Sequence, residues 1–301
     1  MVSVKKKIVQ GKTYYYLELS YRKNGKVHTL TKYLGTALPR TLDKDKEDFL
    51  ISHYKNLWFP LFDAIKMKSA QDRAEQPRGV AKKEMERFTT MFTYATNRIE
   101  GSTLTLRETA ELLEHGLSPK HRPVTDVKEA EAHKTVFNAM LAYNHELRLS
   151  TVLHWHKTLL SQTKVQDAGR IRTYHVGISG SKYEPPMPIE LDFLLREFFP
   201  WYHSNKRTMH PVHLAALVHL RFVSIHPFGD GNGRIARLLM NYVLHRQGYP
   251  MLIIDYSQRN SYYTALERSQ VTKDEHIFVQ WFFKRYYKEY KKFLPEKRKS
   301  R

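Results

Sequence analysis

The spacing of hydrophobic residues changes near residue 40, where alternation of apolar and polar positions gives way to helical spacing. Before this point, three runs are rich in aromatic and β-branched side chains, which is typical of strands. Asn24-Gly25 separates the second and third runs and favours a tight hairpin turn. The predicted strands cover residues 5–10, 14–21 and 26–33.

From residue 41 onward the pattern predicts helices, the first of them over residues 42–58, 61–73 and 80–94. Thr105 and Glu108 have the spacing of a capping box, and Gly116 can end the helix that they begin. The segment from Val212 to Ile225 is apolar nearly all round, which indicates a buried helix. Further helices are predicted over residues 125–143 and 151–160, and from about residue 235 to Gly248.

Composition narrows the class of protein. The chain has 301 residues, 41% of them hydrophobic, which is ample for a core. No apolar run approaches the length of a membrane span, and the charged N-terminus lacks the apolar stretch of a signal peptide. Cysteine is absent, which excludes disulfides and Cys-ligated zinc. These features are compatible with the cytosol, and we expect a cytoplasmic protein.

The net charge of +20 attracts polyanions without identifying them. Within residues 1–40 nine Lys or Arg residues accompany five tyrosines and a single acid, Glu18. Such a β module can contact a nucleic-acid backbone or stack on bases. The alternative is a small docking sheet with a solvated basic face. The segment weakly resembles N-terminal β modules of some transposases.

Residues 226–237 read His-Pro-Phe-Gly-Asp-Gly-Asn-Gly-Arg-Ile-Ala-Arg and concentrate the chemistry of the chain. Three glycines leave the backbone open to a ligand, and a helix is predicted to follow at once. Free N–H groups and the dipole at a helix N-terminus favour an anion, and Arg234 and Arg237 add cationic donors. The loop is therefore predicted to bind phosphate.

Two other side chains of this stretch suggest a reaction. Asp230 is an acid inside a predicted anion site, which fits Mg²⁺ held by one carboxylate together with substrate phosphates. His226 is a base that titrates near neutral pH, at the entrance of the loop. A structural alternative, a glycine-rich loop with an ordinary histidine and surface arginines, explains fewer of these residues.

The stretch resembles the signature of the Fic family, His-Pro-Phe-x-(Asp/Glu)-Gly-Asn-Gly-Arg-x-x-Arg, at every defined position. Fic proteins are mostly AMP transferases that attach the AMP of ATP to a hydroxyl side chain of a target protein. The resemblance implies that His226 deprotonates the target hydroxyl and that Asp230 holds Mg²⁺ on the α- and β-phosphates. ATP, as substrate, and Mg²⁺ are the implied ligands.

The remaining signature positions would hold the nucleotide. By the resemblance, Asn232 and the backbone of Gly231 and Gly233 cradle phosphate oxygens, while Arg234 and Arg237 neutralise the outer phosphates. Related Doc-type kinases have Lys where Gly233 stands, so this residue favours nucleotidyl transfer over phosphoryl transfer. Upstream, Thr96-Asn97-Arg98-Ile99-Glu100-Gly101 straddles a predicted helix end and a loop.

That hexapeptide resembles the Fic inhibitory motif, (Ser/Thr)-x-x-x-Glu-(Gly/Asn), with Thr96, Glu100 and Gly101 at the defining places. In the family this Glu pairs with the second arginine of the signature, here Arg237, and blocks the position of the γ-phosphate. Residues 169–188 resemble the Fic flap, a short β-hairpin that would hold the backbone of the target beside His226.

Tyr262 and Tyr263 resemble family tyrosines that border the adenine, although both residues also fit a role in helix packing. The fold class that follows is mainly α, a Fic-type helical domain with a short β-hairpin flap plus a small N-terminal β module. The expected divisions are a basic β-hairpin module at 1–40, a helical extension with the inhibitory motif at 41–125, a catalytic core at 126–290 and a basic tail at 291–301.

The sequence thus predicts an autoinhibited, Mg²⁺-dependent protein adenylyltransferase that modifies a Ser, Thr or Tyr hydroxyl of a target protein or of itself. Two alternatives remain open. One is a de-AMPylase in which Glu100 positions water, and the other is a nucleic-acid-binding protein whose Fic domain senses ATP. Possible partners besides the target are nucleic acid, through the N-terminal module, and a second copy of the chain in a homodimer. No membrane partner is expected.

Overall fold

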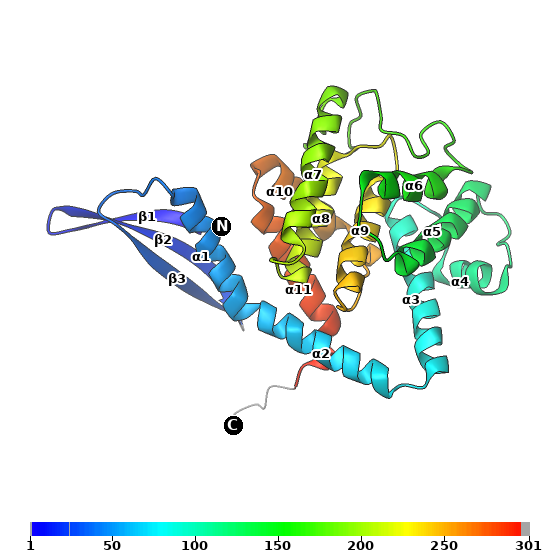
Figure 1. The fold of residues 1–301 in the computed structure, drawn as a ribbon, viewed down its shortest axis with the longest axis horizontal. Helices are drawn as coiled ribbons and strands as arrows, with labels where there is room; N and C mark the ends of the chain where they lie inside the picture. The colour runs from blue at the N-terminus through cyan, green and yellow to red at the C-terminus, as the bar shows by residue number, and fades with distance from the viewer. Residues whose placement is uncertain (1, 24, 296–301) are drawn as a thin grey trace. The chain divides into compact units, whose positions relative to one another are not determined.

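The computed structural model describes residues 2–23 and 25–295. The chain divides into two compact units between Ala64 and Ile65. The N-terminal unit contains a three-stranded antiparallel sheet in the order β1-β2-β3 and helix α1 (Figure 1). The strands are β1 (Val2–Val9), β2 (Lys12–Lys23) and β3 (Lys26–Gly35), and α1 covers Leu42–Leu57.

The three predicted strands are present, and β2 pairs with β1 on one side and with β3 on the other. Gly25 has φ of 78°, as a tight turn between β2 and β3 requires, while the Asn24 of the predicted turn lies outside the described residues. Leu17 and Leu19 on β2 are fully buried because α1 packs over their face of the sheet. The core of this small unit is therefore a helix on one face of a sheet.

The second unit is helical. Its helices are α3 (Arg78–Ile99), α4 (Leu106–His115), α5 (Val124–Ala142), α6 (Leu149–Leu160), α7 (Leu191–Asn205), α8 (Pro211–Ile225), α9 (Asn232–Arg246), α10 (Arg259–Thr272) and α11 (Glu275–Tyr290), and α2 (Phe59–Glu75) runs across the division. Three short 3₁₀ turns cover Pro188–Glu190, Tyr256–Gln258 and Lys291–Phe293. Within the described part of the chain, no helix has the length and apolar character needed to cross a membrane.

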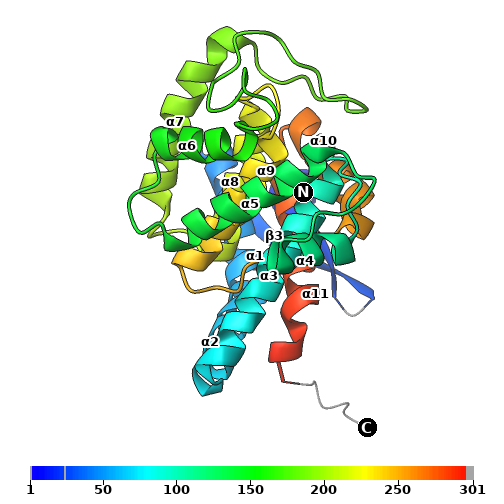
Figure 2. The same cartoon turned by 90° about the vertical axis from the view of Figure 1, so that its right-hand side faces the viewer.

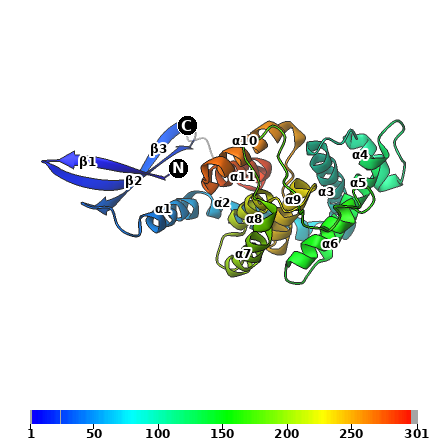
Figure 3. The same cartoon turned by 90° about the horizontal axis from the view of Figure 1, so that it is seen from above.

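Helices α8 and α9 lie side by side at the centre of this unit (Figure 1). Helices α5 and α6 contact α9 on one side, and α11 contacts α8 on the other, an arrangement that is visible from above (Figure 3). Twelve of the fifteen residues of α8 are buried, which confirms the prediction from its all-round apolar pattern. The central pair of helices is therefore a rigid base for the loop that joins them.

Helix α3 is longer than the pattern predicted, since it continues from residue 94 to Ile99. Its last turns are held by polar contacts that periodicity does not report, such as the bond from Thr93 Oγ1 to His133 Nδ1 at 2.8 Å. Helices α3, α4 and α5 contact one another (Figure 2). The predicted capping box of α4 is present, and Gly116 ends that helix with φ of 70°. The hexapeptide at residues 96–101 accordingly straddles a helix end.

The flap predicted as a short hairpin is an irregular loop. Residues 169–187 contain no strand in the described structure. Pro185 and Pro186 carry no backbone N–H, so they cannot donate to a strand ladder. The carbonyls of this loop bond to one buried side chain instead, that of Arg172, as described below.

Candidate active site

The loop of residues 226–231 reverses the chain between two packed helices. His226 ends α8 in the left-handed region, with φ of 51° and ψ of 55°. Gly231 precedes α9 with φ of 79°, and a Cβ there would lie 3.3 Å from the ring of His156. A side chain at residue 231 is therefore disfavoured by both backbone conformation and space. The loop presents the N-terminus of α9, as the sequence predicted.

Asn232 closes this loop with its side chain. Its Oδ1 accepts from the Phe228 N–H at 3.0 Å, and its Nδ2 donates to the Phe228 carbonyl at 2.8 Å. The Asn232 side chain is buried, and both ends of its amide bond to the backbone of Phe228, so it fixes the shape of the loop from inside. The predicted contact of Asn232 with phosphate stays a prediction, and in this arrangement its contribution is the shape of the cradle.

His156 on α6 supports the loop from below. Its ring stacks on Phe228 with centroids 3.7 Å apart. Nδ1 accepts from the Gly169 N–H at 2.9 Å, so Nε2 carries the proton and donates to the Asp230 carbonyl, also at 2.9 Å. Burial lowers the pKa of His156 to about 4, which keeps this ring neutral and the bonding pattern fixed. His156 thus links the signature loop to the start of the flap.

His226 is held in one tautomer. A carbonyl can only accept, so the 3.2 Å contact between Nδ1 and the Val223 carbonyl places the proton on Nδ1. Nε2 is then a bare lone pair on a ring that lines a cavity. Burial lowers the pKa of His226 below its ordinary value, which keeps the ring neutral near pH 7. This is the state that a general base requires.

Arg172 fixes both the flap and the backbone of His226. Its guanidinium donates to three carbonyls, those of His226 at 2.9 Å, Tyr174 at 2.9 Å and Pro186 at 2.6 Å. The side chain is buried, with 4% of the residue exposed. The flap is consequently tied to the candidate base by one residue.

We expect Arg172→Ala to lower the free energy of unfolding by about 2–4 kcal/mol, because three backbone carbonyls lose the charged donor that a buried side chain supplies. Urea denaturation with a constant m-value measures this change. Arg170→Ala removes the same charge from an exposed neighbour and is the control. Equal losses in the two variants would show that Arg172 has no special structural role.

Asp230 lies between two cations. Its carboxylate forms an ion pair with Lys164, contacts Arg234 Nη2 at 3.3 Å, and accepts from the Gly231 N–H at 2.5 Å. Burial acts to raise its pKa, but Arg234 and Lys164 together hold the pKa below its ordinary value. Asp230 is therefore an ionised, partly exposed oxygen ligand on the loop.

Such a carboxylate fits the chemistry of Mg²⁺, which binds one or two carboxylates together with water and phosphate. The Lys164 ammonium already places a cation against the same oxygen atoms. Residues 2–23 and 25–295 contain no group of three or more side chains spaced to ligate a metal. The single Asp230 carboxylate suits a metal that also binds the phosphates of a substrate.

Arg234 has two acidic partners and little exposure, 2% for its side chain. It pairs with Glu129 on α5 and with Asp230 one turn back on its own helix. Glu129 also accepts from Thr163 Oγ1 at 3.1 Å. Arg234 therefore joins α5 to the loop, a contact that the sequence did not predict.

Arg237 is bound by the end of α3. Its Nε donates to Thr96 Oγ1 at 2.6 Å, and its Nη2 pairs with the Glu100 carboxylate. Its Nη1 lies 3.4 Å from the Tyr262 hydroxyl. Only 1% of Arg237 is exposed, and each of its three guanidinium nitrogens has a partner within the protein. The pairing of Glu100 with Arg237, implied by the resemblance, is present.

Glu100 also lies against the phosphate loop. A Cβ at Gly233 would collide with Glu100 Oε1, so the carboxylate lies directly over the first turn of α9. Gly101 follows with φ of 102°, a conformation that favours glycine and turns the chain away. Glu100 thus occupies the place where an anion would approach Gly233 and Arg237.

These groups border one cavity of about 340 Å³. Among the predicted site residues its lining includes Glu100, Gly101, His226, Gly233, Arg237, Tyr262 and Tyr263. The other predicted site residues are not part of that lining: Thr96, Asp230, Gly231, Asn232 and Arg234. The volume lies within the ordinary range of small-molecule sites.

The two predicted tyrosines differ. Tyr262 is 1% exposed and its hydroxyl contacts His219 Nε2 at 2.9 Å, so it packs and supports Arg237. Tyr263 is 38% exposed, and Arg259 lies over its ring at 5.2 Å. A flat ring with an open face is the group that can border a base, so Tyr263 is the better candidate of the pair.

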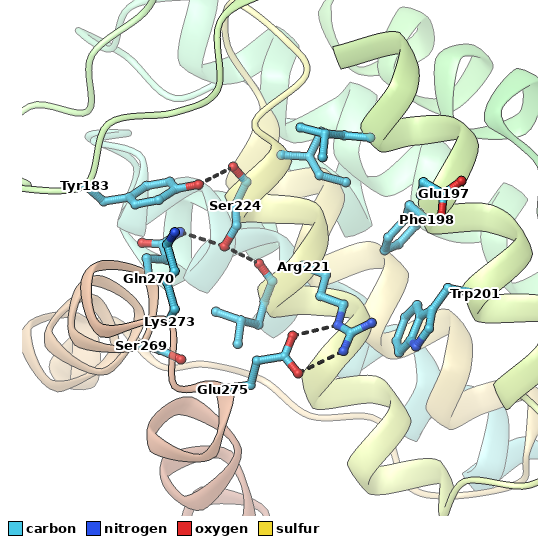
Figure 4. A pocket seen from close by; sticks show the side chains of 13 residues that line it. Tyr183, Glu197, Phe198, Trp201, Arg221, Ser224, Ser269, Gln270, Lys273 and Glu275 are labelled. Carbon is cyan, nitrogen blue, oxygen red and sulfur yellow. Dashed lines mark hydrogen bonds and ion pairs between the residues drawn. The ribbon is translucent and has the colours of Figure 1, made fainter. Parts of the chain in front are cut away.

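A larger hollow of about 580 Å³ (Figure 4) shares one lining residue, Gln270, with this cavity. Tyr183 of the flap donates to the Ser224 carbonyl at 2.8 Å, and Gln270 Nε2 to Ser224 Oγ at 3.0 Å. Arg221 is paired with Glu275 at 2.6 Å and stacks on Trp201 (Figure 4). The lining of the larger hollow includes neither His226 nor the phosphate loop, so the smaller cavity is the candidate active site.

Comparison with known proteins agrees with this geometry. Residues 146–244 match the Fic/DOC family, and this stretch contains the whole signature. Residues 146–244 therefore match a Fic domain, in agreement with the family that the signature resembles and with the mainly helical fold class expected from the sequence.

Two of the curated relatives, from different animals, are both named protein adenylyltransferase Fic. The one from Drosophila ananassae is 38% identical over 184 residues, which are 58% of this chain and 35% of the relative. The one from Nematostella vectensis is 34% identical over 181 residues, or 58% of this chain and 42% of the relative. The chain thus spans well under half the length of these relatives.

Two solved structures share the fold over most of the chain. A Fic-domain-containing signalling protein from Bacteroides thetaiotaomicron superposes with a TM-score of 0.69 at 28% identity, covering 76% of this chain and 95% of that one. Residues 134–508 of Fic-1 from C. elegans give 0.68 at 26% identity, covering 81% and 72%.

Proposed function

We propose that this protein transfers AMP from ATP to a hydroxyl side chain of a target protein or of itself. The observation that carries the proposal is a neutral histidine, fixed in one tautomer, at the mouth of a helix N-terminus that suits phosphate. The names of the curated relatives support the same activity.

Each residue of the site has a separate role in this reaction. His226 Nε2 takes the proton of the target hydroxyl while the hydroxyl oxygen attacks the α-phosphorus. The bond from that phosphorus to the bridging oxygen breaks, and pyrophosphate leaves with the electron pair. The backbone N–H of Gly233 and the dipole of α9 stabilise the charge on the phosphate oxygens, whereas the N–H of Gly231 donates to Asp230 in this structure.

Asp230 would hold Mg²⁺, which supplies positive charge to the phosphates. For the metal to reach that carboxylate, the Lys164 ammonium has to move aside, and its exposed position allows this. Arg234 keeps Asp230 ionised and oriented from the opposite side. The role of Arg172 in this scheme is positional, because it holds the backbone of His226 and the flap together.

We further propose that Glu100 holds the enzyme in an inhibited state. The carboxylate neutralises Arg237, the cation that the outer phosphates of ATP would use, and lies over Gly233. ATP can adopt a productive pose only when this ion pair opens. Autoinhibition is thus a competition between a carboxylate of the chain and a phosphate of the substrate.

A second candidate activity, removal of AMP from a modified protein, is favoured by one observation. Glu100 and His226 line the same cavity, so a carboxylate is available to activate water against an AMP-protein bond. The two activities make opposite demands on Glu100, since one is inhibited by it and the other requires it. The alternative of a pure ATP sensor gains no support, because sensing needs no fixed neutral base.

The test of adenylyl transfer uses ATP labelled at either the α- or the γ-phosphate. The protein and a cell lysate are incubated with each nucleotide and Mg²⁺, and covalent label is measured after denaturation. Adenylyl transfer predicts label from the α-phosphate alone, with pyrophosphate as the second product. Label from the γ-phosphate would indicate phosphoryl transfer and overturn the proposal.

The pH profile of the reaction follows from the lowered pKa of His226. The base is neutral and competent above its pKa and loses activity as the pH falls through that value. Because the pKa in the protein lies below the ordinary 6.5, we expect the rate to fall to half of its maximum at a pH below 6.5. A half-maximal rate above pH 7 would contradict the buried, neutral base.

A further inference from the structure

The N-terminal sheet has one face that α1 does not cover. Strand residues alternate between the two faces, and the face with Leu17 and Leu19 is the one that meets α1. Tyr21 belongs to that covered face, and its ring lies 4.5 Å from that of His53 on α1. Lys32 on the same face pairs with Asp45 of α1 at 2.9 Å.

The opposite side is here named the open face, and the register defines its residues. Lys5 on β1, Tyr16 on β2 and Tyr33 on β3 form one row across the three strands. Lys7 lies opposite Tyr14 in the next row. Lys12, at the start of β2, shares the alternation of Tyr14 and Tyr16 and is exposed. The open face therefore carries three lysines beside three tyrosines.

Charge on this sheet is strongly one-sided. Residues 2–35 contain eight Lys or Arg and one acid, Glu18. Glu18 lies on the open face and its carboxylate is 3.6 Å from Lys5 Nζ, so it offsets part of one lysine. Ser20 and Thr29 on the same face add hydroxyl groups, which lie 3.2 Å apart. Cations with hydroxyls at strand spacing suit phosphate oxygens and base edges.

The tyrosines favour a duplex over a single strand. Their rings pack on one another, with centroids 5.3 Å apart for Tyr16 and Tyr33 and 6.3 Å for Tyr14 and Tyr33, in tilted pairs. Lys7 Nζ lies 5.1 Å from the centre of the Tyr16 ring. Tyr33 alone among the three is more than half exposed, at 53%. Successive bases of a single strand need open ring faces on which to stack, and this cluster offers few.

The width of the sheet selects the groove. Three strands spaced about 4.8 Å apart place the outer backbones about 10 Å from each other, close to the width of the major groove of B-form DNA at about 12 Å, so the side chains of the open face, rather than the whole sheet, would enter that groove. The major groove of double-stranded RNA is deep and narrow and excludes such an element. We propose that the open face of β1–β3 binds double-stranded DNA in its major groove, with Lys5, Lys7 and Lys12 on phosphates and the tyrosine and threonine hydroxyls toward the groove.

The test measures binding of the full chain to a labelled 20-base-pair DNA duplex by fluorescence anisotropy, at several salt concentrations. The variant Lys5→Gln/Lys7→Gln removes two charges from the open face. Lys6→Gln/Lys26→Gln removes two exposed charges that alternation assigns to the other face, and is the matched control. Thermal melting confirms that both variants fold.

Each phosphate contact contributes about 0.9 to the slope of log K against log salt concentration. We expect the open-face variant to lose about two units of slope and to bind about 10- to 100-fold more weakly at 100 mM salt. The control variant should stay within about threefold of the unmodified chain. Labelling by α-labelled ATP serves as an independent readout, and the open-face variant should retain it.

Four outcomes would overturn the proposal. The control variant losing as much affinity as the open-face variant would mean that DNA responds only to the total charge. Single-stranded DNA competing as well as the duplex would indicate a stacking surface. Double-stranded RNA competing equally would exclude major-groove binding, and polyglutamate competing equally would indicate an acidic protein as the partner.

Discussion

Replacing Glu100 by glycine is expected to raise AMP incorporation by more than about tenfold. The carboxylate pairs with Arg237 and lies over Gly233, so it removes a cation and adds a negative charge where the outer phosphates of ATP bind. Two unit charges about 4 Å apart interact by roughly 4 kcal/mol at an effective dielectric near 20, and half of this corresponds to more than about tenfold. Self-labelling by α-labelled ATP measures the gain without a known target.

Two substitutions serve as controls for this prediction. Glu100→Asp keeps the charge on a shorter side chain and should release the enzyme less than glycine does. Glu267→Gln removes another acid of the same cavity, on α10, and should leave labelling near the starting level. The Glu100→Gly change should also abolish any removal of AMP, which separates the two candidate activities. Unchanged labelling with intact ATP affinity would show that Glu100 does not inhibit.

The second large effect is expected from His226→Ala, made in the Glu100→Gly background so that the starting rate is high. A positioned general base typically contributes about 10² to 10⁴-fold, and we expect transfer to fall by that factor. ATP affinity should change little, because the phosphates are bound by the loop and the arginines rather than by this ring. Initial rates of labelling and isothermal titration with ATP measure the two quantities.

His154→Ala is the matched control for that loss. His154 is an exposed histidine on α6, so its removal changes the composition equally without touching the cavity. A His226→Ala variant that transfers AMP within a factor of about two of its parent would remove the histidine from the mechanism. A parallel fall in ATP affinity would assign it a binding role instead.

Local patterns predicted the parts of the molecule that are determined locally. The hairpin turn, the capping box of Thr105, the buried helix before His226 and the helix after Gly231 depend on side chains within a few positions of each other. The pairing of Glu100 with Arg237 spans 137 positions, and it was expected only through the resemblance to a family. Geometry across such a distance cannot be derived from spacing along the chain.

The supporting residues were missed for the same reason. Arg172 contacts His226 across 54 positions, and Glu129 contacts Arg234 across 105 positions. A buried arginine in an irregular loop carries no periodic signal, and His156 looks like any histidine on a helix. The resemblance to the family implied that Asn232 contacts phosphate, whereas in the structure its side-chain amide bonds to the backbone of Phe228. The type of a residue indicates which hydrogen bonds it can form, and the packing of the folded chain decides which partner it bonds to.

The position of Glu100 at the very end of α3 has a kinetic consequence. Its backbone N–H still bonds to the Asn97 carbonyl at 3.0 Å, but the next residue is a glycine at φ of 102°. Rotation of this side chain, or fraying of one terminal turn, opens the ion pair while the rest of α3 stays packed. Such motions take nanoseconds to microseconds, far less than one turnover of a typical enzyme.

With about 2 kcal/mol favouring the closed pair, about 3% of molecules are open at any moment. Exchange between the closed and the open ion pair is fast, so every molecule spends that fraction of its time able to bind ATP in the productive pose. Under the proposed inhibition by Glu100, the protein would therefore keep a low, steady activity and would not be completely inactive. A partner that stabilises the frayed end of α3 would raise this activity toward that of the Glu100→Gly variant.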